Sequence, residues 1–383
     1  MNDVTDLNAA RARARRRRSA GVAIDFDPGR LVLARRLAGV QRTRIAAAVG
    51  VTPAAVTQFE KGLSRPTLPV LEGMSDALGV PPEFFRSGNP VPGLSPGGAH
   101  FRSLRATTSL EREAALAFAE VALVVFAAVE RFVELPEVSL PELEVPADLE
   151  TDDAISLARA SRKLMRLEGG PVPNMVRLLE AHGVVVIEMH EGSHRVDAFS
   201  HQGQLRPVVV LSSLKGDKAR RRFDAAHELG HLVMHHDIEP GSRLAEEQAH
   251  AFAAEFLAPG DELGPQLPTK LDWLALHELK RRWGISLKAL VVRSFKLGRF
   301  GGTTYQRAMR QLSAWGLPEP GPLGPPEMPV LLPRALALLD EPEPTEWLAR
   351  ETGLPVEVVS RVLEASGDRA QRPVLRLDVA TDA

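Results

Sequence analysis

The sequence predicts a mainly α-helical protein with a small β-sheet. Apolar residues recur at helical spacing along much of the chain, as in residues 114–129 and 246–257. Three short runs, at residues 184–189, 196–200 and 207–211, have instead the composition of β-strands. A length of 383 residues is enough for two or three domains, each with a sizeable core.

The N-terminus of the chain is strongly basic. Residues 1–21 contain six closely spaced arginines, and no apolar segment follows them, so they do not form a secretory signal. We expect a disordered basic arm. Contact with DNA phosphates and a solvated tail without a role are equally good interpretations of it.

Residues 22–95 have the pattern of a helix-turn-helix domain. Ala46 is small enough for two helices to cross closely, and Gly50 can adopt the positive φ of a tight turn. Thr52 and Pro53 are residues typical of the start of the next helix. The pattern resembles the XRE-type (lambda-repressor-like) helix-turn-helix. This resemblance implies a five-helix bundle that binds double-stranded DNA.

The helix expected over residues 52–60 would enter the major groove of DNA. Four of its residues are candidates for contact with base edges: Thr52, Ala54, Thr57 and Gln58. Four basic residues are candidates for contact with phosphates: Arg42, Arg44, Lys61 and Arg65. The alternative is a helix-turn-helix that is used only for protein contact.

A connecting helix is expected within residues 96–133. Thr108 and Glu111 form a capping-box pattern ahead of it, and apolar residues cover most of its faces. Such a helix is buried between domains or subunits, or in the core of one chain, and the sequence favours neither. Residues 134–153 are acidic and carry three prolines spaced five apart, which predicts a stiff linker.

Composition narrows the function classes. The chain has no cysteine, which excludes disulfides and thiolate zinc ligands and fits a cytoplasmic location. A net charge of -2 combines the basic N-terminus with the acidic stretch further along. No uninterrupted apolar run is long enough to span a bilayer, so we expect no membrane partner.

Residues 227–231 read His-Glu-Leu-Gly-His and have the spacing H-E-x-x-H. On a helix, His227 and His231 lie one turn apart on one face, so both imidazoles can reach the same metal ion. Glu228 lies beside them, where its carboxylate can take a proton from an attacking water. The pattern predicts metal-assisted hydrolysis. The alternative is a buried helix whose histidines are satisfied by neighbouring groups.

A second helix, expected from about residue 246, offers a third ligand. Glu246 and His250 lie four residues apart on one face, and Gly241 and Ser242 lie in the connection before them. Two imidazoles, one carboxylate and a water complete the four-coordinate arrangement of a catalytic zinc site. The alternative is that Glu246 belongs to a solvated acidic face.

Together the two helices resemble the ImmA/IrrE metallopeptidase family. The resemblance covers residues 154–300 and implies an α+β zincin-like domain. It implies that three residues bind zinc (Zn2+), His227, His231 and Glu246, and that Glu228 activates water. This family usually has asparagine at the position of His250. We expect His250 to support Glu246 from behind, and competition of His250 for the metal is the alternative.

Residues 301–383 are expected to form a C-terminal helical region. Gly353 and its neighbours align with Gly50 and the helix-turn-helix around it, but the face that would meet DNA is acidic. A helical scaffold is therefore favoured over a second DNA-binding unit.

The function we expect is that of a DNA-binding transcription regulator with a zinc-dependent endopeptidase domain. The expected partners are double-stranded DNA and a protein substrate, with a repressor as the first candidate, and a homodimer is a further candidate assembly. The alternative is a transcription factor whose zincin-like domain is a non-catalytic module for ligand sensing or dimerisation. The intact Glu228 favours the enzyme, because a purely structural site has no use for that carboxylate.

Overall fold

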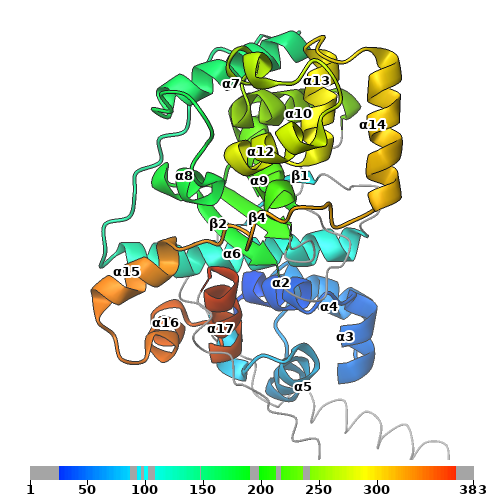
Figure 1. Cartoon of the computed structure of the whole chain (residues 1–383). Helices are drawn as coiled ribbons and strands as arrows, with labels where there is room; N and C mark the ends of the chain where they lie inside the picture. Colours follow the sequence, from blue (N-terminus) through cyan, green and yellow to red (C-terminus); the bar gives the residue numbers. More distant parts are fainter. Residues whose placement is uncertain are drawn as a thin grey trace, which may run out of the picture.

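A computed structural model describes residues 26–86, 93–95, 99–101, 108–146, 148–189, 198–212, 217–235 and 242–367 (Figure 1). The protein is mainly helical and has one small sheet, which confirms the predicted fold class. The basic arm predicted over residues 1–21 lies outside the described residues, as do Gly241 and the end of the C-terminal region.

The described part of the N-terminal bundle has four α-helices and one 3-10 helix. These are α2 (Pro28–Leu37), α3 (Arg42–Val49), α4 (Pro53–Glu60), α5 (Leu68–Leu78) and η1 (Pro82–Phe85). Gly50 ends α3 with a φ of 66°. The Thr52 hydroxyl accepts a hydrogen bond from the Ala55 N–H at 3.1 Å. The turn and the helix cap predicted for a helix-turn-helix are therefore both present.

The sheet has the strand order β1-β3-β4-β2. Its strands are β1 (Ala99–Phe101), β2 (Val185–Met189), β3 (Ala198–His201) and β4 (Val208–Ser212). β2 and β4 are parallel, whereas β3 is antiparallel to both of its neighbours. Side chains alternate between the two faces, so that Ile187 and Val210 face one apolar core while Val186 and Val209 face another.

Helix α6 (Ser109–Glu130) lies between the N-terminal bundle and the sheet (Figure 1). The predicted capping box of Thr108 and Glu111 begins it. The buried side chains of the bundle, of α6 and of one sheet face form a single core, so the helix is buried between domains of this chain. Among the described helices, neither α6 nor any other combines the length and the apolar character needed to cross a membrane.

A buried ion pair orients the bundle on α6. Both carboxylate oxygens of Glu120 lie 2.8 Å from Nη1 of Arg36, and Oε1 also accepts the Leu94 N–H at 2.7 Å. Glu120 is only 2% exposed. Burying a carboxylate is costly unless hydrogen bonds replace its water, and these three contacts do so.

The described residues between 131 and 150 contain no helix or strand, but they are packed against the protein. Leu135 and Leu149 are buried, and Leu140 and Leu143 contact the core on the far side of the sheet. Helix α7 (Thr151–Leu164) begins inside the segment expected as a linker. The prolines therefore belong to an extended connection whose leucine side chains pack against the apolar core.

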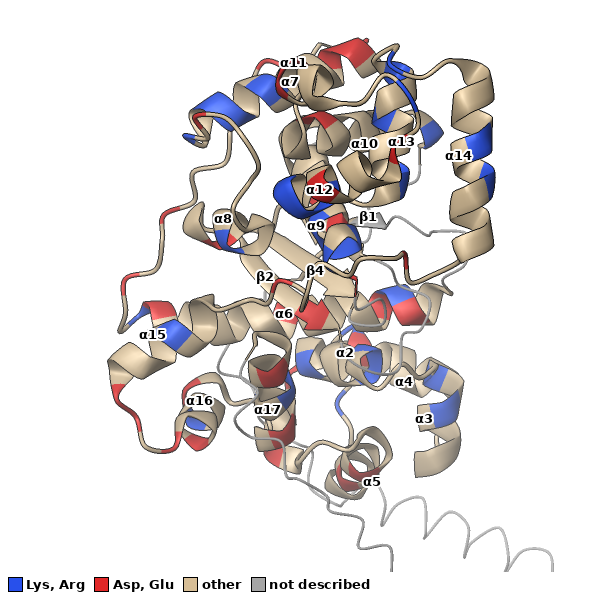
Figure 2. Cartoon of the chain, in the orientation of Figure 1, with Lys and Arg blue, Asp and Glu red and all other residues tan. Residues whose placement is uncertain are grey.

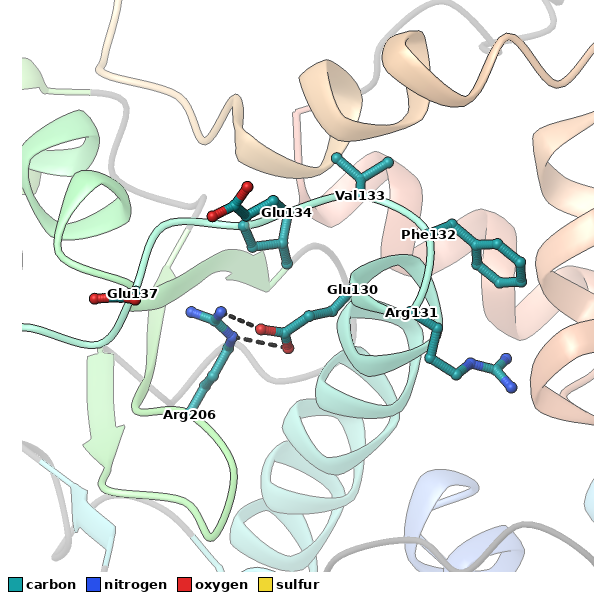
Figure 3. Close-up of a pocket in the computed structure, with 8 residues that line it drawn as sticks. Glu130, Arg131, Phe132, Val133, Glu134, Glu137 and Arg206 are labelled. Carbon is teal, nitrogen blue, oxygen red and sulfur yellow. Dashed lines mark hydrogen bonds and ion pairs between the residues drawn. The ribbon is translucent and has the colours of Figure 1, made fainter.

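Arg206 fastens this connection to α6 and to the sheet (Figure 3). Its guanidinium faces both carboxylate oxygens of Glu130, with 3.1 Å between Nε and Oε2. Nη1 donates to the carbonyls of Pro136 at 2.7 Å and Gly183 at 3.2 Å. Arg206 and Glu130 line a hollow of about 440 Å³ together with residues that follow α6. Because each guanidinium nitrogen has a protein partner, Arg206 serves as a fastening group in this hollow.

The second apolar core lies between the other sheet face and a group of helices. After α7 these are α8 (Met175–Ala181), α9 (Lys218–Met234), α10 (Arg243–Leu257), α11 (Gly260–Leu263), η3 (Gly264–Gln266), α12 (Trp273–Trp283), α13 (Leu287–Lys296) and α14 (Gly302–Trp315). α14 packs on α13 although it lies beyond residue 300. The second core therefore extends past the expected end of the domain.

The remaining C-terminal helices pack on α6 instead. They are α15 (Leu331–Leu339), α16 (Pro344–Thr352) and α17 (Val356–Ala365). Gly353 separates α16 from α17 with a φ of 63°, close to the φ of 66° at Gly50. Arg30 of α2 donates to the carbonyl of Thr352 at 3.2 Å, and the apolar side of α17 is buried. This arrangement fits the expected helical scaffold.

Glu180 of α8 is a buried carboxyl group that links the two cores. It is 4% exposed, and its Oε1 accepts the N–H groups of Val330 and Leu331, both at 2.9 Å, at the start of α15. Burial raises the pKa of Glu180 from 4.5 to about 7, although the hydrogen bonds and the charges of Arg334 and Arg177 act in the opposite direction. The folded protein therefore holds this proton more tightly than the unfolded chain does.

Stability linked to Glu180 is complete below about pH 4.5 and is lost as the pH rises to about 7. Glu180→Gln removes the titration and keeps an oxygen for the two N–H groups. We expect the variant to gain stability relative to the wild type by up to about 3 kcal/mol as the pH rises across this window. Denaturant titrations at several pH values measure the gain, and a difference that does not change with pH would contradict the assignment.

Candidate metal centre

Helices α9 and α10 lie side by side and form the centre of the second domain (Figure 1). Gly230 of α9 allows their close approach, because a Cβ atom there would lie 3.1 Å from the ring of Phe252 in α10. The side chains of Asp217 and Ser242 accept an N–H group in the first turn of α9 and α10, respectively. Local capping thus defines where each helix begins, and the glycine sets how near they pack.

His227, His231 and Glu246 come together between these helices. The Nε2 atoms of the two histidines are 3.1 Å apart. They lie 3.3 Å and 3.4 Å from the two carboxylate oxygens of Glu246. Both imidazoles are buried, whereas the Glu246 side chain is 22% exposed. The structure thus brings the three expected ligands to one point that opens on one side to solvent.

The protonation of the cluster suits a cation. Burial lowers the pKa of His227 to about 3, so this imidazole is neutral near pH 7 and can offer a lone pair. Glu246 supplies the carboxylate of the trio, with its two oxygens facing the Nε2 atoms of the two histidines. Two imidazoles and an ionised carboxylate are typical ligands of zinc.

Glu228 is fully buried beside the cluster. Its Oε2 accepts a hydrogen bond from the Ser200 hydroxyl at 2.7 Å. Ser200 lies on β3, whose side chains at this position face the second core. The sheet therefore fixes the orientation of the carboxylate that was expected to activate water. Nothing in the sequence pattern pointed to Ser200, because its contact with Glu228 arises only from the packing of β3 on α9.

Two further polar residues support the cluster and were not expected from the sequence. Nδ1 of His235 lies 2.9 Å from Nδ1 of His231, and its Nε2 lies 3.0 Å from Oε1 of Gln248. The Gln248 amide donates to the carbonyl of Leu149 at 2.5 Å. A signal for His235 was present, since it continues the four-residue spacing of His227 and His231.

The contact between His250 and Glu246 that the structure shows is made with the Glu246 backbone, and support of the carboxylate by His250 stays a prediction. Its Nδ1 lies 2.7 Å from the backbone carbonyl of Glu246, and its side chain is exposed. The imidazole ring lies edge-on to the ring of His227, with 4.7 Å between centroids. Because residues four apart on a helix meet side chain to backbone as readily as side chain to side chain, the spacing alone did not decide this geometry.

The base-facing candidates lie along α4. Thr52, Ala54 and Gln58 are exposed, whereas Thr57 is half-buried. The Thr57 hydroxyl donates to the Pro53 carbonyl at 3.0 Å, so its proton is already used within the helix. Ala54 and Gln58 therefore remain the clearest candidates for contact with base edges.

Two of the basic candidates lie on α3 and two follow α4 in the sequence, and Figure 2 shows the basic segments of α3 in blue. Arg44, Lys61 and Arg65 are exposed. Arg42 is engaged by Glu60, with 2.5 Å between Nε and Oε2, and the same carboxylate also holds Arg35. This ion pair competes with phosphate contact by Arg42.

Comparison with known protein families agrees with both parts of this description. Residues 31–85 match the helix-turn-helix family, and residues 179–295 match the IrrE N-terminal-like domain. No curated protein matches the chain. The second match includes α9 and α10 with all three residues of the cluster. The chain therefore carries an XRE-type helix-turn-helix domain followed by a metallopeptidase-like domain of the ImmA/IrrE family.

Proposed function

We propose that this protein is a DNA-binding transcription regulator whose second domain is a zinc-dependent endopeptidase. The observation that carries the proposal is the spacing of the donor atoms of His227, His231 and Glu246. A tetrahedral ion with bonds of about 2.0–2.1 Å requires ligands about 3.3–3.4 Å apart. The separations of 3.1, 3.3 and 3.4 Å fit this requirement.

Three protein ligands leave one position of a tetrahedral site open, which is typical of catalytic zinc and not of structural zinc. When bound, zinc supplies Lewis-acid polarisation of a carbonyl group and makes water more acidic. Of the three side chains, that of Glu246 is the one that reaches solvent, at 22% exposed. This position is where a peptide carbonyl would approach the site.

Glu228 is the general base of the proposed reaction. Its buried carboxylate accepts the Ser200 hydroxyl through Oε2, and a general base of this kind takes the proton of the attacking water. The same carboxyl group then gives this proton to the leaving amine as the peptide bond breaks. Glu228 is therefore a carboxylate again at the end of the reaction. The hydrogen bond from Ser200 holds the carboxylate in one orientation throughout.

In this proposal the DNA-binding domain brings the peptidase domain to a specific site on DNA. α4 would enter the major groove with Ala54 and Gln58 toward the bases, while Arg44, Lys61 and Arg65 contact phosphates. The substrate we propose is a protein that is itself bound near the same DNA, with a repressor as the first candidate. A non-catalytic sensing or dimerisation module is the competing function, and the experiments below separate the two.

Glu246→Gln is expected to weaken zinc affinity by more than about 100-fold, because it removes the only charged ligand of the trio. Competition titration with a chromophoric chelator measures the affinity. Glu247→Gln is the matched control, since Glu247 is a neighbouring exposed residue paired with Arg243. Equal zinc affinity in wild type and Glu246→Gln would remove Glu246 from the site.

Glu228→Gln is expected to keep stoichiometric zinc and to lose all cleavage, because the amide cannot accept a proton. The readout is the set of new protein N-termini that appear in cells expressing the wild type and not the variant, together with zinc content by elemental analysis. Identical N-termini in both strains would support the non-catalytic module instead. Loss of zinc in the variant would make Glu228 a structural residue.

Gln58→Ala is expected to weaken operator binding by about 1–3 kcal/mol and to leave the salt dependence unchanged, since a base contact is lost and a phosphate contact is not. The operator is first selected from random duplexes with the wild-type protein. Gln311→Ala, an exposed glutamine on α14, is the control and should bind as the wild type does. An equal loss of affinity on random DNA would place Gln58 away from the base edges.

A further inference from the structure

A chain of buried polar groups begins at the metal cluster and ends outside it. It runs from His231 in α9 to His235, then to Gln248 in α10, and stops at the Leu149 carbonyl ahead of α7. His235 and Gln248 are 1% and 2% exposed. The successive atoms are 2.9, 3.0 and 2.5 Å apart.

The carbonyl of Leu149 determines which atom donates and which accepts in each hydrogen bond of this chain. A backbone carbonyl can only accept, so the Gln248 amide nitrogen faces Leu149 and Oε1 faces His235. Nε2 of His235 must then carry a proton to donate to Oε1. In neutral His235 the other nitrogen, Nδ1, is an acceptor, and it lies 2.9 Å from Nδ1 of His231, which is placed to donate a proton to it.

We propose that His235 and Gln248 position His231 for metal binding by fixing it in the Nδ1–H tautomer; this rests on the proposed metal site. The tautomer leaves the lone pair of His231 on Nε2, which is the atom that faces His227 and Glu246. The lone pair on His231 Nε2 and the carboxylate oxygen Oε1 of Glu246 are then two acceptors that face each other at 3.4 Å, which is the separation of two ligands of one tetrahedral zinc ion. A cation between them satisfies both.

The two histidines of the cluster differ in this respect. Nδ1 of His227 has no hydrogen-bond partner among the residues that the structure describes. Its ring is held by packing, with Phe223 at 6.4 Å and His250 at 4.7 Å between centroids. His231 is therefore the imidazole whose tautomer is set by the protein, and Gln248 also ties it to the helix that carries Glu246.

Gln248→Met tests the proposal, because methionine has a similar length and lacks the acceptor for His235. We expect zinc affinity to fall about 10–100-fold, the range found when the outer partner of a ligating histidine is lost. We also expect nitrogen-15 shifts of the imidazoles to show His231 as Nδ1–H in the metal-free wild type and as a tautomer mixture in the variant. Gln311→Met on α14 is the control for the substitution itself and should change neither readout.

Two substitutions of His235 distinguish loss of the hydrogen bond from loss of folding. His235→Asn retains a side-chain oxygen that can accept from His231, whereas His235→Leu does not, so zinc affinity should fall less in the asparagine variant. Thermal melting of the metal-free proteins shows whether each variant is folded. Zinc affinity within twofold of the wild type in folded Gln248→Met, or equal losses in His235→Asn and His235→Leu, would overturn the proposal. A wild type that binds no zinc would instead overturn the proposed function.

Discussion

The contact between α9 and α10 is the constraint on which the site depends. Zinc ligands must lie within a few tenths of an ångström of their ideal positions, and here the three proposed ligands come from two different helices. A glycine at residue 230 allows the Phe252 ring to lie where any larger residue would press on it. Small changes in this packing would separate Glu246 from the two histidines even if every ligand remained present. The geometry of the proposed metal site therefore depends on the core packing between α9 and α10.

Much of the site was predictable because helical spacing alone determines it. The four-residue interval between His227 and His231 places two imidazoles on one face in any α-helix, and Glu228 follows between them. The cap at Thr52 and the positive φ at Gly50 are similarly local, so the helix-turn-helix was predictable from the same kind of pattern. These features need no knowledge of the rest of the fold.

What could not be predicted depends on contacts between distant segments. Ser200 meets Glu228 because β3 packs on α9, and Leu149 meets Gln248 because an extended connection returns to the second core. The same cause explains why residues 131–150 are packed and why the C-terminal helices divide between two cores. Proline spacing and acidic composition describe the stiffness and charge of a segment, but they do not describe the surface against which it lies.

The shared core around α6 has a consequence for how the two domains would work together. A flexible linker would let the peptidase sample many positions around a DNA site, with an effective concentration that falls as the linker lengthens. Here α2, α6 and one face of the sheet are buried together, and the Arg36–Glu120 pair sits inside that interface. Buried ion pairs of this kind contribute little net stability but disfavour alternative orientations, because any other arrangement leaves a charge unpaired. The position of the metal centre relative to α4 is then a fixed property of the fold. Under the proposed function, this geometry would favour cleavage of a protein held at one distance and orientation beside the bound helix-turn-helix over the same protein free in solution.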